Sequence, residues 1–130
     1  MKGGRHLALL SIALLIPACN GGTVDQHALD NDSSAIDSLA CEGALLAHQV
    51  VDGATTEPFT RVHAGELATR ASNFEDALSQ RPTTPGIESA VRTEAEKAGR
   101  VADLLHQLEA NDADSAAELK GRLEQEGDCA

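Results

Sequence analysis

Apolar residues recur every three or four positions along most of the chain after residue 33, which is the spacing of one face of an α-helix. No segment alternates apolar and polar residues as a half-buried strand does, and no internal repeat is visible. The pattern predicts an all-α fold, a small antiparallel bundle over residues 34–130. Its four helices are expected at about 34–51, after Thr56 with Pro58 in the first turn, from Pro85 to about Ala110, and, as a short last helix, from Ser115.

Capping residues and prolines set the expected helix boundaries. Ser33 or Ser34 is expected to cap the first helix, with Asp37 completing a start that is similar to a capping box. Pro82 lacks an N–H and disfavours a helical conformation in the residue before it, so the second helix must end there. Thr84 is expected to cap the third helix, with Pro85 at its first position.

The apolar face of each helix predicts the core. The first and third faces are stripes of aliphatic residues and alanine, whereas the second includes both phenylalanines of the chain. The residues expected to point inward are Ile36, Leu39, Ala40, Gly43, Leu46, Ala47 and Val50; Phe59, Leu67, Ala71, Phe74 and Leu78; Ile87, Val91, Ala98, Val101, Ala102, Leu105 and Leu108; and Ala116, Leu119 and Leu123. The exposed faces carry acid–arginine pairs four residues apart, which support local helix structure: Glu66 and Arg70, Glu88 and Arg92, Glu96 and Arg100, and Glu118 and Arg122.

Residues 1–18 follow a different pattern. Lys2 and Arg5 give a positive start, and residues 7–16 consist of Leu, Ala, Ile and one Ser. Ten such residues at about 1.5 Å each cover about half of a hydrocarbon core that is roughly 30 Å thick. The segment is therefore predicted to be an export signal that is removed, not a membrane-spanning helix.

Ile16, Pro17, Ala18 and Cys19 follow the apolar run: a branched apolar residue, a tolerant position, a small residue and a cysteine. This tetrad resembles the lipobox of bacterial lipoproteins, although Pro17 stands where a small or β-branched residue is more usual. The resemblance implies cleavage between Ala18 and Cys19 and attachment of acyl chains to Cys19. The alternative is an ordinary secretory signal followed by an ordinary cysteine.

Lipidation of Cys19 would anchor the protein in the cell envelope without a spanning helix, because two or three acyl chains hold a protein essentially permanently. Asn20 is not the Asp that resembles an inner-membrane retention signal, so in a Gram-negative host we expect the outer membrane, on its periplasmic face or at the surface. Residues 19–33 are rich in Asn, Gly, Asp and Ser. They are predicted to be a flexible tether that holds the domain roughly 20 Å from the anchor.

Cys41 and Cys129 remain once Cys19 carries lipid. An exported protein meets an oxidising compartment, where two spare cysteines usually pair, so we expect one disulfide. It would close a loop of about 88 residues and stabilise the fold by roughly 4 to 5 kcal/mol in the chain-entropy model. Cys41 and Leu45 share a side of the first helix away from its main stripe, where the C-terminal segment is expected to dock.

The acidic composition limits the possible partners. The chain has 10 Lys and Arg against 21 Asp and Glu, and the signal contains two of the cations. Nucleic-acid binding requires clustered cations, so it is not expected. The partners expected are the membrane, through the acyl chains on Cys19, and another envelope protein.

The candidate chemistry is sparse. His63 falls within the apolar stripe of the second helix and is interpreted as a hydrogen-bonded core residue. The sequence contains no HExxH, CxxC or CxxCH motif and no nucleophile–base motif, so we expect neither an enzyme nor a cofactor nor a metal site. Two hypotheses remain: a non-enzymatic interaction or structural module of the envelope, and a small-ligand or cation-binding bundle that uses His63 or the acidic faces. The first predicts an exposed apolar patch, the second a cavity with convergent polar groups.

Overall fold

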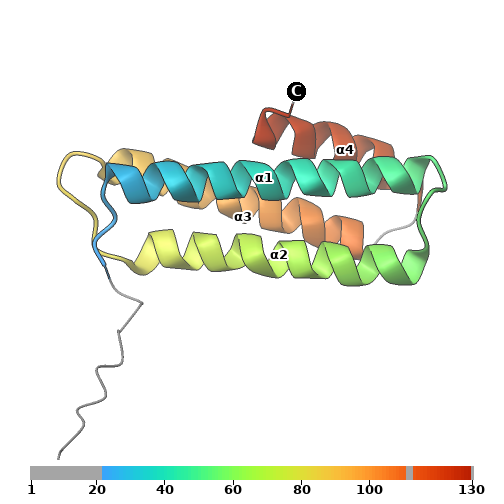
Figure 1. Cartoon of the computed structure of the whole chain (residues 1–130), viewed down its shortest axis with the longest axis horizontal. Helices are drawn as coiled ribbons and strands as arrows, with labels where there is room; N and C mark the ends of the chain where they lie inside the picture. The colour runs from blue at the N-terminus through green and yellow to red at the C-terminus, as the bar shows by residue number, and fades with distance from the viewer. Residues whose placement is uncertain (1–21, 111–112, 130) are drawn as a thin grey trace, which may run out of the picture.

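The computed structural model describes residues 22–110 and 113–129. The predicted signal, its cleavage site at Ala18 and Cys19, and Cys19 itself lie outside the described residues. The four helices are α1 (Gln26–Val51), α2 (Glu57–Gln80), α3 (Glu88–Ala110) and α4 (Ala113–Gly127). Successive helices run in opposite directions, and the short α4 covers only part of the bundle (Figure 1). The predicted all-α antiparallel bundle is confirmed.

The first helix begins earlier than predicted. α1 starts at Gln26 and not near Ser34, because the Asp25 carboxylate accepts a hydrogen bond from the backbone N–H of Ala28 at 2.8 Å. Leu29 is buried and lies two turns before Ile36, so it extends the apolar stripe upstream. Residues 26–33 are therefore helix, and the prediction of a tether that reaches residue 33 is wrong.

The second helix begins after Thr56 with Pro58 in its first turn, as predicted. It ends at Gln80 because Arg81, the residue before Pro82, adopts an extended conformation with φ −77° and ψ 144°. α2 is therefore bounded by prolines at both ends.

The third helix begins at Glu88, later than the predicted start at Pro85. Thr84 is not its N-cap, because an N-cap stands directly before the first helical residue and Thr84 lies four residues before Glu88. The Thr84 backbone N–H instead donates to the carbonyl oxygen of Val24 at 2.9 Å. Gly86 then adopts a left-handed conformation with φ +102°, which no helix start at Pro85 can include. The Gly86 N–H donates to the Glu88 carboxylate at 2.8 Å, so the glycine closes the turn from which α3 begins.

Alanine dominates the contact between α2 and α3, the most extensive helix–helix contact of the bundle. Small side chains allow two helix backbones to approach closely, whereas leucines lie where α1, α3 and α4 meet: a Cβ at Gly43 of α1 would contact Leu105 of α3 and Leu123 of α4. The buried alanines of this contact are Ala64, Ala68 and Ala71 on α2 and Ala95, Ala98 and Ala102 on α3. Most predicted core residues are buried; Val50, Phe74 and Ile87 are half-buried, and Phe59 is exposed. No helix in the described part of the chain is both long and apolar enough to cross a membrane.

Candidate functional site

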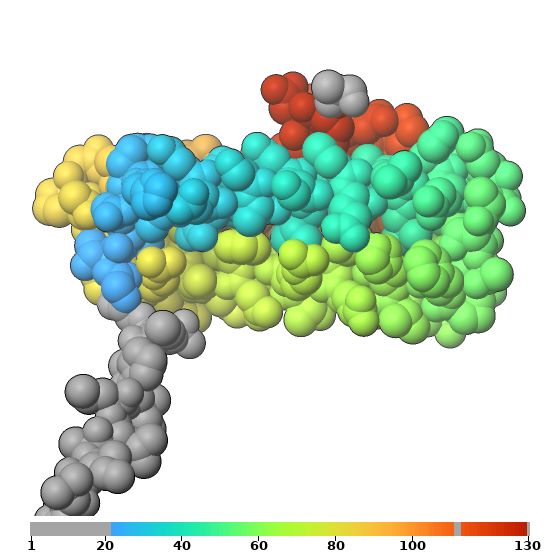
Figure 2. All heavy atoms as spheres, viewed as in Figure 1, coloured from blue at the N-terminus to red at the C-terminus, as the bar shows by residue number. Residues whose placement is uncertain are grey.

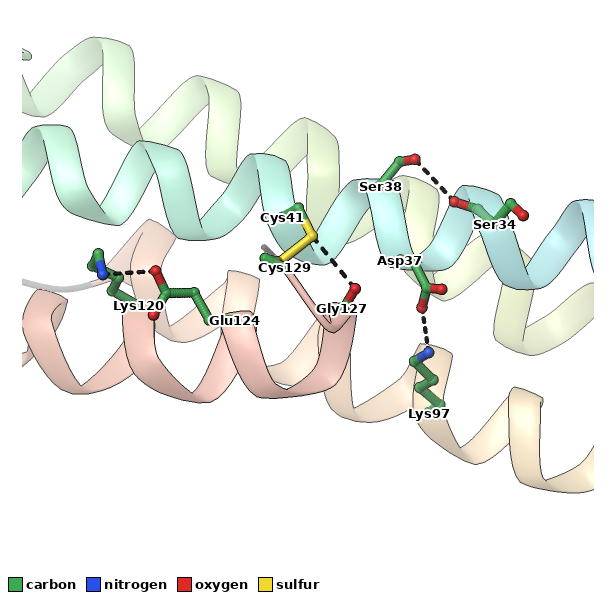
Figure 3. Close-up of a disulfide and its surroundings, with 9 residues drawn as sticks. All are labelled: Ser34, Asp37, Ser38, Cys41, Lys97, Lys120, Glu124, Gly127 and Cys129. Carbon is green, nitrogen blue, oxygen red and sulfur yellow. Dashed lines mark hydrogen bonds and ion pairs between the residues drawn. A yellow bond between two sulfur atoms is a disulfide. The ribbon is translucent and has the colours of Figure 1, made fainter.

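The structure joins the middle of α1 to the C-terminal end of α4 through a disulfide between Cys41 and Cys129 (Figure 3). The two Cα atoms are 5.6 Å apart, so the prediction that these cysteines pair is confirmed. The chain turns back toward α1 at Asp128, which has a positive φ of 47°, and the Cys129 N–H donates to the Glu124 carbonyl oxygen at 3.1 Å. The disulfide therefore fastens the shortest helix to the longest.

Two ion pairs between helices lie in the same half of the bundle. Lys97 on α3 pairs with Asp37 on α1, one turn before Cys41 (Figure 3). Arg100, which the sequence pattern pairs with Glu96, donates across to both carboxylate oxygens of Glu126 on α4, at 2.9 and 3.1 Å. These hydrogen bonds raise the pKa of Arg100 above its ordinary value. Because that pKa rises on folding, the associated stability is fully present below the ordinary arginine pKa, which includes neutral pH.

Residues 22–25, which we name the strap, are fixed to the loop between α2 and α3. The N–H of Val24 donates to the Pro82 carbonyl oxygen at 2.7 Å, and the Val24 carbonyl accepts from Thr84 at 2.9 Å, a parallel bridge. The Val24 side chain is fully buried, with 0% exposure. Arg81 reinforces the strap, since its Nε donates to the Gly22 carbonyl at 3.1 Å.

Four large apolar side chains are exposed on α1 and α2: Val51 at the C-terminal end of α1, and Leu45, Phe59 and Val62, which we name the apolar outer face. Leu45 on α1 is 57% exposed, and Phe59 and Val62 on α2 are 55% and 63% exposed. Phe59 stacks on His63 with ring centroids 5.6 Å apart, and His63 Nε2 lies 3.0 Å from the Glu42 carboxylate on α1. Glu42 and Leu45 are three residues apart on α1, as are Phe59 and Val62 on α2, so each pair is adjacent on its helix surface. The His63–Glu42 contact thus connects the two halves of the face.

The position of Phe59 corrects the predicted core of α2. The inward face of its first turn is formed by Thr60, whose hydroxyl donates to the Thr56 carbonyl at 3.0 Å and is thereby satisfied inside the protein. Thr60, Ala64, Ala68 and Ala71 recur every three or four residues, and this small-residue stripe was the signal that the apolar pattern alone missed. The expectation for Leu45 is also wrong, because α4 leaves most of that side chain uncovered.

A groove between α2 and α3 adjoins the apolar outer face. Val62 and Gly65 contribute to it from α2, and His106 and Glu109 line it from α3. The absence of a side chain at Gly65 lets the Glu109 side chain lie close to α2, since an added Cβ would be 3.0 Å from the Glu109 carboxylate. Figure 2 shows α1 and α2 side by side along the viewed face, which is elongated.

The histidines occupy separate places. His63 was predicted to be a hydrogen-bonded core residue, but it is half-buried at the α1–α2 boundary, with its Nε2 3.0 Å from the Glu42 carboxylate. His48 pairs with Asp52 at 3.3 Å, and His106 pairs with Glu109 at 3.0 Å. Within residues 22–110 and 113–129, no group of three or more His, Cys, Asp or Glu side chains is placed to hold a metal ion.

No protein-family model matches the chain, and neither a curated protein nor a solved structure matches it significantly.

Proposed function

We propose that the protein is a lipid-anchored, non-enzymatic envelope protein that binds another envelope protein through the apolar outer face. The observation that carries the proposal is the exposure of Leu45, Phe59 and Val62. The chain has two phenylalanines and no Trp or Tyr, yet one phenylalanine lies on the surface. Full burial of such a side chain stabilises a fold by about 1.5 to 3 kcal/mol, and Phe59, at 55% exposure, leaves about half of that unrealised in the isolated bundle.

The disulfide and the sequence of residues 16–19 support the cellular setting. A structural disulfide persists in an oxidising compartment and is rare in the cytosol. The lipobox-like tetrad that ends at Cys19 implies both export from the cytosol and lipid attachment, which agrees with a disulfide formed outside the cytosol. Together they favour an exported protein that stays attached to a membrane.

The anchor is tested by mass spectrometry of the product extracted from membranes by detergent. We expect an N-terminus at Cys19 that carries acyl chains, and we expect Cys19→Ala to abolish both the acylation and membrane retention. An uncleaved N-terminus, or an unmodified thiol at Cys19, would overturn the proposed anchor.

The docking face is tested by placing a photo-crosslinking amino acid at Val62 in cells, with the exposed Ala90 of α3 as the matched control position. We expect one discrete adduct from position 62 and none from position 90. Adding Leu45→Asp, which leaves the crosslinker in place, should remove the adduct if the three side chains form one surface. An adduct of equal yield from both positions, or one insensitive to Leu45→Asp, contradicts the assignment of this face.

A further inference from the structure

We propose that the strap end of the bundle faces the membrane and that the helices stand away from the bilayer, so that the loop between α1 and α2 is the most distant part. This orientation rests on the proposed lipidation of Cys19. It follows from the place where the chain first joins the folded body, at the end that also carries the loop between α2 and α3 (Figure 1).

The covalent distance between anchor and body is short. Cys19 precedes Gly22 by three residues, and an extended chain covers at most about 3.5 Å per residue, so the anchor lies within about 10 Å of Gly22. The loose tether expected from composition would have ended at residue 33. Docking of Val24 removes most of that freedom.

The strap is held by several independent contacts. Val24 is fully buried, and its N–H and carbonyl both bond to the loop between α2 and α3. Arg81 binds the Gly22 carbonyl and also lies 3.6 Å from the Asp32 carboxylate on α1. Peeling the strap away would expose an apolar side chain and break these hydrogen bonds, so the chain leaves the body at a fixed point.

Charge favours the upright arrangement over one in which the bundle lies along the bilayer. Anionic headgroups attract clusters of Lys and Arg, whereas the chain without residues 1–18 keeps 8 of the 10 Lys and Arg and all 21 Asp and Glu, a formal net charge of −13. Electrostatic repulsion from the anionic headgroups, together with the short segment between Cys19 and Gly22 at one end, directs the long axis of the bundle away from the bilayer. α1 has 26 residues and is therefore about 39 Å long, so its two ends stand at clearly different heights.

The orientation has a consequence for the proposed docking face. Phe59 and Val62 lie in the first two turns of α2, next to the loop between α1 and α2. They are therefore presented on the half of the bundle that is far from the lipid, where a protein on the same or the facing membrane can reach them.

Energy transfer from tryptophan to a headgroup-labelled lipid measures the two heights. The chain contains no Trp or Tyr, so Pro85→Trp in the loop between α2 and α3 and Ala54→Trp in the loop between α1 and α2 each provide a single reporter at an exposed position. Each lipidated, full-length mature protein is bound to preformed phosphatidylethanolamine–phosphatidylglycerol vesicles that contain a dansyl-labelled lipid. We expect transfer from Pro85→Trp to exceed that from Ala54→Trp severalfold.

The strap itself is tested by Val24→Asp, with Thr23→Asp as the matched control that adds the same charge at an exposed position. Val24→Asp should free the strap and reduce transfer from the Pro85→Trp reporter, while Thr23→Asp should leave it unchanged; circular dichroism confirms that both variants keep their helices. Equal transfer from both loops, or no difference between the two strap variants, would overturn the proposed orientation. If the protein lacks acyl chains and neither reporter transfers energy, the proposed anchor is contradicted instead.

Discussion

Gly127 lies directly against Cys41, so closely that a Cβ atom on the glycine would be 2.8 Å from the Cys41 Sγ and 2.9 Å from the Asp37 carbonyl oxygen. The same Cβ would be 2.9 Å from the Cys129 Sγ. Backbone and disulfide atoms surround the glycine, and neither can move aside as the end of a flexible side chain does. The close approach of α4 to α1 at the disulfide therefore depends on the absence of a side chain at this residue.

Gly127→Ala is predicted to destabilise the fold by about 1 to 3 kcal/mol, the range for overpacking a well-packed site. Gly121 on the same helix is the control, because a Cβ there meets nothing within 4 Å. Gly121→Ala should be neutral or stabilise by up to about 1 kcal/mol through helix propensity. Urea unfolding followed by circular dichroism measures both. Similar shifts in the two variants would show that Gly127 is not a packing position.

Removal of the disulfide by the double substitution Cys41→Ser and Cys129→Ser is predicted to lower the free energy of unfolding by about 2 to 5 kcal/mol. The cross-link joins residues 88 apart in sequence, so it restricts the unfolded chain over nearly the whole folded body. Wild-type protein in reductant is the control for the polarity of serine and should show the same loss. An unchanged urea midpoint in the double variant would contradict a stabilising role for the cross-link.

Gly43 and Gly99 are predicted to respond differently to alanine. A Cβ at Gly43 would collide with Leu105 and would lie 3.3 Å from Leu123, and both leucines are fully buried, so Gly43→Ala should destabilise by about 1 to 3 kcal/mol. A Cβ at Gly99 would lie 2.8 Å from the end of the Glu75 side chain. That carboxylate can swing into solvent, so Gly99→Ala should cost little or gain up to about 1 kcal/mol. Thermal melts of the two variants, measured in parallel, check the contrast; a larger loss at Gly99 would reverse this interpretation.

The helices were predictable because apolar periodicity and helix breakers act locally. Pro58 and Pro82 bound α2 through their own covalent geometry, whatever surrounds them. The cysteine pairing was also predictable, because with Cys19 assigned to the anchor only Cys41 and Cys129 remained. By contrast, Asp25 and Ser34 are both competent N-caps, and the choice between them depended on whether Leu29 finds a surface to pack against.

The face of α2 could not be read from hydrophobicity, because burial there is governed by the space between two helices. Close approach of α2 and α3 selects Thr60 and the alanines after it and leaves Phe59 outside. The apolar outer face, which is the candidate site, depends on which face of α2 packs against α3. Its residues were therefore not predicted individually.

The sequence by itself determined the helical class and the pairing of Cys41 with Cys129, since each depends on residue type and local spacing. Only the tertiary structure decided that Val24 docks on the loop between α2 and α3 and that Leu45, Phe59 and Val62 remain outside. Those outcomes depend on contacts between segments distant in sequence, where the fit of shapes and the pairing of buried backbone groups select one arrangement among several that the local pattern allows.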